Sequence, residues 1–105
     1  MEHAVIAYFC LADGPSELPS GRAAFEDLED KLRDAIDRDG VGEFDGVESG
    51  QGQHVLYMYG PDADRLFACT EVLLRSTPLA RRGYVEKRYG EAGLPGVKVT
   101  RIDLV

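Results

Sequence analysis

Apolar side chains recur along the chain with two different periods, and these periods predict where strands and helices lie. Residues 3–11 are apolar at both alternating sets of positions, a pattern typical of a strand covered on both faces. We therefore expect this segment to be a central strand. Residues 20–39 instead repeat apolar side chains at steps of three and four residues, which predicts a helix whose buried stripe is formed by Phe25, Leu28, Leu32 and Ile36.

The rest of the chain predicts a second helix and further strands. Residues 54–59 alternate, with Val55, Tyr57 and Tyr59 on one face and Leu56 and Met58 on the other. The segment before them, residues 41–48, is polar and rich in glycine, so it suits an edge strand or a bulge. The remaining elements are expected at residues 61–76 (helix), 84–89 (strand) and 97–105 (strand), with a turn at 90–96.

The element order β-α-β-β-α-β-β predicts an α+β fold. Its first six elements match the ferredoxin-like arrangement, in which two helices cover one face of an antiparallel sheet, and the last strand extends it. We expect a two-layer sandwich in which the stripe of the first helix meets that of the second, formed by Leu66, Phe67, Thr70 and Leu73. A chain of 105 residues has the size of one domain, so residues 1–105 are expected to fold together.

Charge and composition narrow the classes of partner. The formal net charge is −7 and the pI is near 4.7, which disfavours nucleic acid and anionic lipid and favours basic partners. No apolar run is long enough to cross a membrane, and the first residues lack the basic segment of a signal peptide. We therefore expect a cytoplasmic protein.

Cys10 and Cys69 have no metal-ligand or redox spacing, and Cys69 is expected to be the more reactive thiol.

Acidic residues are concentrated in the first part of the chain. Residues 1–74 contain 16 of the 19 acidic residues and 5 of the 12 basic ones, whereas the C-terminal part is basic. The polar face of the first helix carries carboxylates at four-residue steps, where like charges repel. Solvation explains such a surface most simply, and recognition of a basic protein is the sharper interpretation. The residues that would carry it are Glu26, Asp30, Asp34 and Asp37 on the helix and Glu43 and Asp45 on the next strand. Ion pairs expected to offset the repulsion are Asp27–Lys31, Glu29–Arg33 and Asp34–Arg38.

Tyr8, Tyr57 and Tyr59 are expected on the sheet face that the helices leave open. RNA-recognition domains of this topology stack bases on such aromatic rings. This chain lacks their Lys/Arg-Gly-aromatic pattern and has the wrong charge for phosphates. The tyrosines therefore belong to the core or form an apolar surface, which a small molecule, the terminal hairpin or a second copy of the chain would cover.

The residues capable of chemistry do not form a recognised catalytic or metal-binding motif. Glu43, Asp45, Glu48 and His54 are suitable metal ligands, but strand alternation is expected to point Glu48 away from the other carboxylates unless a bulge intervenes. His3 and His54 are the side chains suited to act as a base near neutral pH, and neither has an evident nucleophile partner in the sequence. The sequence thus predicts no metal and no cofactor. It contains no argument for an enzyme, which stays a third interpretation because catalytic sites can assemble from residues far apart in the chain.

One segment resembles a known family. Residues 42–48, Gly-Glu-Phe-Asp-Gly-Val-Glu, look like the Gly-Gly-Glu-Tyr-Asp-Gly-Trp-Glu segment of the bacterial protein regulators of the degradosome endoribonuclease, with Val47 in place of an aromatic residue. The resemblance implies a small acidic α+β protein that binds and inhibits a nuclease. The combination EFDGVE, LYMYGPDADRLF and YVEKRYG also resembles a group of small bacterial α+β proteins of unknown function.

Two functions follow as expectations. The first is an acidic protein-binding or regulatory module that inhibits a basic partner such as a nuclease or toxin, with the carboxylates of the first helix as its surface. The alternative is a small-molecule-binding domain that uses the open sheet face around Tyr8, Tyr57 and Tyr59, working as a homodimer.

Overall fold

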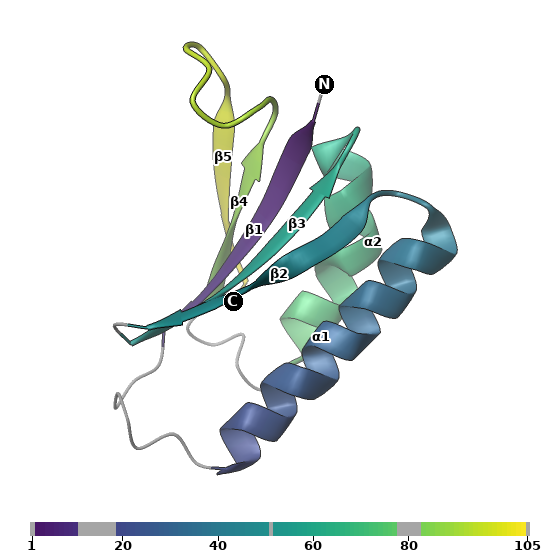
Figure 1. The fold of residues 1–105 in the computed structure, drawn as a ribbon, viewed down its shortest axis with the longest axis vertical. Coiled ribbons are helices and arrows are strands. Elements are labelled where there is room, and N and C mark those ends of the chain that lie inside the picture. The colour runs from purple at the N-terminus through teal and green to yellow at the C-terminus, as the bar shows by residue number, and fades with distance from the viewer. Residues whose placement is uncertain (1, 11–18, 51, 78–82, 105) are drawn as a thin grey trace.

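The computed structural model describes residues 2–10, 19–50, 52–77 and 83–104, which form an α+β fold of two helices and an antiparallel sheet (Figure 1). The order of elements is the one that the sequence predicts. The strands are β1 (His3–Cys10), β2 (Glu43–Gly50), β3 (Gln53–Gly60), β4 (Gly83–Arg88) and β5 (Val99–Asp103), and the helices are α1 (Pro19–Asp39) and α2 (Ala63–Ser76).

The sheet is five-stranded with the order β2-β3-β1-β4-β5, and each neighbouring pair is antiparallel. β1 lies at its centre, between β3 and β4, as its double apolar pattern predicts. The β4–β5 hairpin continues the sheet sideways, so β5 is an edge strand. Of the covers expected for the open face, the terminal hairpin is therefore wrong, and the second copy of the chain stays a prediction.

Both helices pack on the same face of the sheet, and the main core lies between the two layers (Figure 1). The predicted stripe of α1 meets the predicted stripe of α2 over β1 and β3, and this part of the fold prediction is confirmed. The side chains buried at this interface include Phe9, Leu32, Ile36, Leu56, Met58 and Leu66. The buried hydroxyl of Thr70 donates to the carbonyl of Leu66, so its polar atom has a partner inside the helix.

α2 begins later than the sequence pattern suggests. The side chain of Asp62 accepts hydrogen bonds from the amides of Asp64 and Arg65, and it therefore caps a helix that starts at Ala63. Pro61 was expected in the first turn, but it lies before the cap. A carboxylate at this position satisfies orphan amides and also interacts favourably with the positive end of the helix.

β2 is an edge strand with a bulge, as its glycines suggest. The register with β3 shifts between Phe44 and Gly46, so Asp45 is an extra residue on the β2 side. The bulge brings Glu43 and Glu48 to the same face, where they lie opposite Tyr59 and Val55. The structure thus has the exception that the sequence analysis named, and Glu48 does not point away from Glu43.

Two glycines allow β2 and β3 to approach each other at their open end. A Cβ atom on Gly42 would lie 2.0 Å from the carbonyl oxygen of Tyr59, and one on Gly60 would lie 2.2 Å from that of Val41. Both contacts are with backbone, which cannot move aside as a side chain can. Glycine is required at both positions.

Candidate functional site

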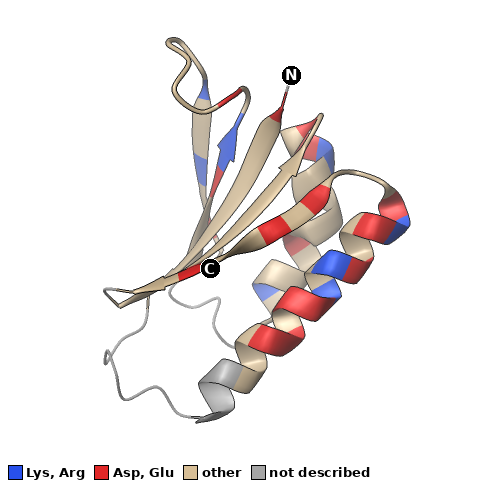
Figure 2. Ribbon diagram, viewed as in Figure 1, with Lys and Arg blue, Asp and Glu red and all other residues tan. Residues whose placement is uncertain are grey.

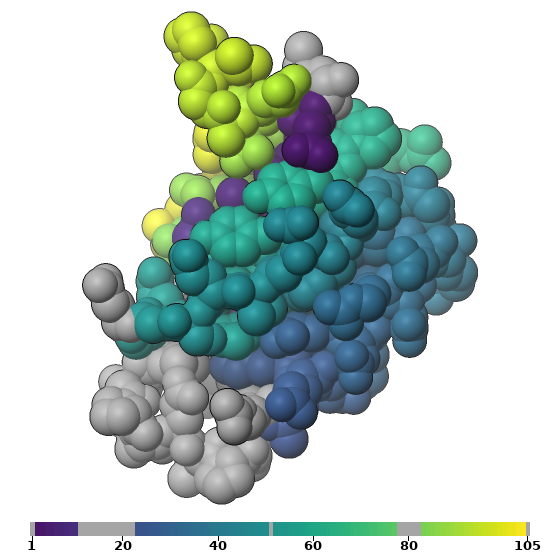
Figure 3. All heavy atoms as spheres, viewed as in Figure 1, coloured from purple at the N-terminus to yellow at the C-terminus, as the bar shows by residue number. Residues whose placement is uncertain are grey.

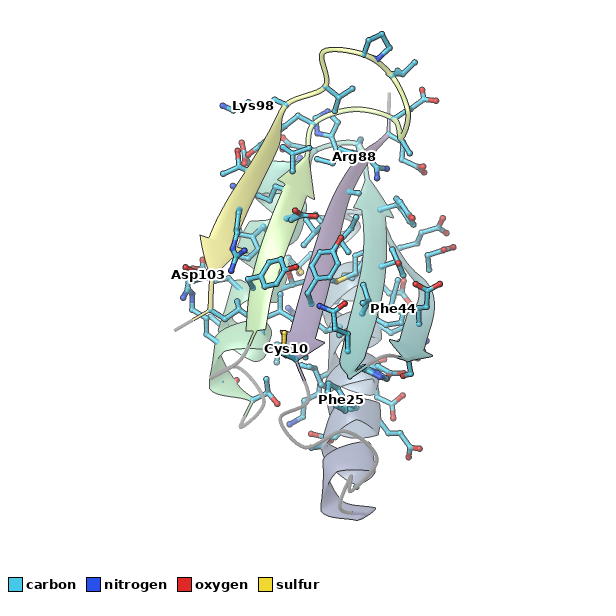
Figure 4. All side chains as sticks on the ribbon, turned by 90° about the vertical axis from the view of Figure 1, so that its left-hand side faces the viewer. Cys10, Phe25, Phe44, Arg88, Lys98 and Asp103 are labelled. Carbon is cyan, nitrogen blue, oxygen red and sulfur yellow. The ribbon has the colours of Figure 1, made fainter. Side chains whose placement is uncertain are left out.

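A second apolar cluster lies on the sheet face opposite the helices. Ala4, Ile6 and Val55 are each at most 8% exposed there, although neither helix covers them. The rings of Tyr8, Tyr57 and Tyr59 pack against them. We call this surface, with Tyr84 of β4, the tyrosine face; Figure 4 looks directly onto it. The structure thus brings together the three tyrosines that the sequence singles out.

Tyr84 is a member of this face that the sequence analysis missed. Its ring stacks on that of Tyr8, with centroids 4.8 Å apart, and the guanidinium of Arg101 lies 3.9 Å from the centroid of the Tyr84 ring. Stacked rings and a cation over a ring both stabilise a flat aromatic surface. Strand alternation in β4 could have predicted its position. Val85 is buried on the helix side of the sheet, so its neighbour Tyr84 must point to the opposite face.

Two tyrosine hydroxyls on this face are bound to carboxylates. Tyr57 donates to Oε1 of Glu48 at 3.1 Å. Burial and a hydrogen bond to Glu86 raise the pKa of Tyr8 above its usual value, and burial and Glu48 raise the pKa of Tyr57. Both phenols therefore stay protonated at neutral pH and act as hydrogen-bond donors.

The charged rim of the tyrosine face differs between its two sides. On the β2 side, Glu43 and Glu48 are exposed. On the β4–β5 side the face carries Arg88 and Arg101 together with two carboxylates that already have partners there, Glu86 with Tyr8 and Asp103 with Arg101. Nε of Arg88 donates to the carbonyl of Gly90 at 2.8 Å. One rim is thus acidic, and the other presents two guanidinium groups among balanced charges.

A hollow of about 400 Å³ lies at the end of the tyrosine face where β3 stops. It is lined by Glu2, Gly42, Glu43, Tyr59, Gly60 and Pro61. The two glycines that let the strands approach also contribute no side chains that would fill the hollow. The result is an open depression beside an aromatic ring, at the edge of the apolar cluster.

The acidic surface predicted on α1 is present, and β2 continues it (Figure 2). Glu26, Asp30, Asp34 and Asp37 are exposed, as are Glu43 and Asp45.

One of the three ion pairs predicted on α1 is present: Asp27 pairs with Lys31, at 3.0 Å. The other two predicted ion pairs are wrong: Arg33 pairs with Asp30 and stacks on Phe44, and Arg38 pairs with Asp39. Within the described part of the chain, Glu26, Asp34 and Asp37 form no ion pair.

His54 has partners that the sequence did not reveal. Its Nε2 lies 3.2 Å from Oε2 of Glu29, its Nδ1 is hydrogen-bonded to Oγ of Ser49, and the ring of Phe25 lies 4.0 Å away. The side chains of His54 and Glu29 are 13% and 18% exposed. The hydrogen bonds from Ser49 to His54 and from His54 to Glu29 therefore connect the β2–β3 hairpin to α1. His54 lies on the helix side of the sheet, away from Glu43 and Glu48.

His3 and Cys69 also have structural roles in this fold. Nδ1 of His3 accepts a hydrogen bond from the amide of Ala63, which satisfies one orphan donor at the start of α2. The thiol of Cys69 donates to the carbonyl of Ala35, and burial raises its pKa to about 11. It stays a thiol at neutral pH and is a poor nucleophile. The exposed thiol is Cys10, so the expectation that Cys69 is the more reactive cysteine is wrong.

Among the residues that the structure describes, no three His, Cys, Asp or Glu side chains gather closely enough to hold a metal ion. Across the same residues, no helix is both long and apolar enough to cross a membrane.

Comparisons with known proteins identify the fold alone. No protein-family model matches the chain, and no curated protein matches it. Among solved structures, the chain is similar to that described as the structure of Rv0793 from Mycobacterium tuberculosis, with 17% sequence identity and a TM-score of 0.53. The match covers 97% of this chain and 93% of that one, so the likeness in fold extends over nearly the whole length of both chains.

Proposed function

We propose that the protein is a small-molecule-binding domain that works as a homodimer, with the tyrosine face as its binding surface and a second copy as its cover. One observation carries the proposal: Ala4, Ile6 and Val55 are buried beneath tyrosine rings on a face that neither helix covers. An apolar patch with aromatic rings and a few fixed polar groups has the composition of a ligand site. The ligand is a planar aromatic molecule, because stacked rings fit a flat partner.

The strand order supports a finer description of the fold. Read from β4, the first four strands run β4-β1-β3-β2, with both helices on one side. We infer that this part of the domain is ferredoxin-like and that β5 extends it. The extension widens the open face beyond β4, which adds Arg101 to the rim.

A cytoplasmic location is part of the proposal. Cys10 is free and exposed, and Cys69 is free as well. Exposed free thiols are typical of proteins from reducing compartments.

The chain offers a direct spectroscopic test because it contains five tyrosines and no tryptophan. Tyr89 contacts His3 and Asp64 beside α2, so a Tyr89→Phe variant leaves Tyr8, Tyr57, Tyr59 and Tyr84 as its tyrosines. We expect 1-anilinonaphthalene-8-sulfonate, a planar aromatic probe, to quench this emission and to brighten as it binds.

Ile6→Lys places a charge in the middle of the apolar strip and is expected to abolish both probe binding and dimer formation. Val72→Lys is the matched control, because Val72 is a 73% exposed side chain on α2. A wild-type chain that neither sediments as a dimer nor binds the probe would refute the proposal. Equal binding by the Ile6→Lys variant would refute the choice of surface.

A second function has its own support in the acidic surface of α1. Glu26, Asp34 and Asp37 are exposed without an ion pair in the described residues. Figure 2 shows Asp and Glu along α1 and β2, with Lys and Arg between them on α1. An acidic flank of this kind steers a basic protein toward it. We propose that this flank binds a basic partner such as a nuclease or toxin. The test is whether the purified protein inhibits RNA cleavage by the degradosome endoribonuclease, and whether added salt relieves the inhibition.

A further inference from the structure

The register of the sheet defines which residues share a level across the tyrosine face. Glu43, Tyr59, Ala4, Arg88 and Val99 form one row, from β2 to β5. The next row consists of Gly46, Tyr57, Ile6, Glu86 and Arg101, and the last of Glu48, Val55, Tyr8, Tyr84 and Asp103. β1 is the central strand of each row, so a second copy centred on the apolar strip places Ile6 opposite Ile6.

A two-fold symmetric pair of aligned sheets can form in two ways. With the axis across the strands, each strand faces its own copy: Glu43 then faces Glu48, Glu86 faces Glu86, and Arg101 faces Arg101. With the axis along the strands, the strand order reverses and the rows are kept. Like charges facing each other across an interface cost several kcal/mol, which disfavours the first arrangement.

The second arrangement pairs most of the face favourably. Tyr59 faces Arg88, which suits a cation over a ring. Tyr57 faces Glu86 and adds no hydrogen bond there, because its hydroxyl already donates to Glu48. Arg101 faces Gly46, where a Cβ atom would meet nothing within 4 Å, so there is room for a guanidinium group. Glu43 and Glu48 lie diagonally from Arg88 and Arg101. The one unfavourable pair is Glu48 with Asp103, and Asp103 already has Arg101 as its partner.

The projecting β4–β5 connection fits the same arrangement independently. Residues 89–98 stand out from the body as a knob (Figure 3), and Leu94 within it is 51% exposed. This connection lies beyond Arg88 and Val99, at the same end of the sheet as the 400 Å³ hollow beside Tyr59 and Pro61. With the axis along the strands, the connection of one copy reaches the hollow of the other.

We propose that two copies of this chain pack tyrosine face to tyrosine face about an axis along the strands, so that β2 of one copy covers β5 of the other. In this dimer Leu94 of each copy occupies the hollow lined by Gly42, Tyr59 and Pro61 of its partner. The inference rests on the proposed function, in which a second copy closes the binding surface, and it specifies the orientation and the contacts.

Charge reversal on one rim at a time tests the orientation by sedimentation equilibrium. A Glu43→Arg variant and an Arg88→Glu variant should each dimerise about tenfold or more weakly than wild type, because the substituted side chain then lies diagonally across the interface from a group of its own charge, Arg88 in the first variant and Glu43 in the second. A chain carrying both substitutions should regain most of the wild-type affinity. Circular dichroism of each variant separates lost association from lost folding.

The hollow is tested separately with Leu94→Ser, a substitution in an exposed turn that leaves the sheet unchanged. It should weaken the dimer about tenfold by removing one buried leucine from each contact, whereas Val72→Ser on the outer face of α2 should not. A monomeric wild type would refute the homodimer of the proposed function together with this inference. A dimeric wild type whose rim variants dimerise equally well would overturn the orientation alone. Unchanged dimerisation of Leu94→Ser would overturn the seating of Leu94.

Discussion

Glu29 of α1 and His54 of β3 join the two layers of the domain, with Oε2 of Glu29 lying 3.2 Å from Nε2 of His54. Ser49 holds the other ring nitrogen, and Phe25 covers the ring. The hydrogen-bonded imidazole thus fixes the hairpin end of the sheet against the first helix. Both side chains are largely removed from water, so their partners cannot simply be replaced by solvent.

We expect Glu29→Ala to lower the free energy of unfolding by about 1–3 kcal/mol, the cost of leaving a mostly buried polar group unpaired. Asp30→Ala is the control, since the Asp30–Arg33 pair is exposed and its partners are 3.6 Å apart. Such surface pairs contribute about 0–1 kcal/mol. Urea denaturation of both variants measures the difference, and equal midpoints would show that the Glu29–His54 contact does not stabilise the fold.

The sequence predicted the layers of this domain better than its side-chain contacts. The spacing of apolar residues alone located both helices and the central strand. A helix buried along one stripe has apolar residues three and four positions apart, and a strand buried on both faces is apolar at every position. Glu29 and His54 are 25 residues apart, and their contact depends on how α1 is placed over the sheet. Local patterns carry no information on such a distance.

The tyrosine face was partly predictable for the same reason. Alternation placed Tyr57 and Tyr59 on one face, and the double apolar pattern of β1 required a second buried surface around Tyr8. The glycines of β2 indicated an edge strand or a bulge, but they did not locate the bulge at Asp45, which decides the side of Glu48. A single extra residue inverts every later side chain of a strand.

The interlayer core gives the most direct stability prediction. Leu32 of α1 and Leu66 of α2 are both 0% exposed and belong to the same hydrophobic core. Each Leu→Ala change should cost about 2–5 kcal/mol through lost burial and a cavity. Val72→Ala, at a 73% exposed site, should change the unfolding midpoint little. A small effect at either leucine would mean that the two helices do not meet as described.

Gly60 should not tolerate even a methyl group. The added Cβ of Gly60→Ala would lie 2.2 Å from the carbonyl oxygen of Val41, so β2 and β3 must separate. We expect a loss of about 1–3 kcal/mol or more from this overpacking. Gly50→Ala is the matched control, because nothing lies within 4 Å of its Cβ position. Thermal unfolding compares the two, and equal midpoints would contradict the close approach at Gly60.

Asp64 and Lys87 connect α2 to β4 and should make stability depend on pH. Oδ1 of Asp64 lies 2.8 Å from Nζ of Lys87 and 2.6 Å from the hydroxyl of Tyr89. Lys87 and then Tyr89 lower the pKa of Asp64 below its usual value of 3.8. A carboxyl whose pKa is depressed in the folded state stabilises the fold above its unfolded pKa and loses this effect as the pH falls through the folded value.

Asp64→Asn is therefore expected to be less stable than wild type at pH 7, and the difference should vanish in acid well below pH 3.8. Asp37→Asn on the exposed face of α1 serves as the control and should show little difference across the same range. Urea midpoints measured at several pH values provide the comparison. A difference between Asp64→Asn and wild type that persists unchanged in acid would assign the effect to the side-chain replacement rather than to the charge.

The acidic surface of α1 makes the last prediction. Glu26, Asp30 and Asp34 lie at four-residue steps on the exposed side of the helix, where mutual repulsion slightly weakens it. Replacing all three by Lys should leave the fold intact, since none is buried.

If the surface binds a basic nuclease, the variant should lose most of its inhibition in the cleavage assay with the degradosome endoribonuclease. The wild-type inhibition should fall with salt, because the Debye length shrinks from about 10 Å at 0.1 M to about 3 Å at 1 M. Glu91→Lys, an exposed change outside α1, is the control for net charge. Equal inhibition by the triple variant, or inhibition that salt leaves unchanged, would rule out the α1 carboxylates as the binding surface, since their attraction to a basic partner must weaken under both conditions.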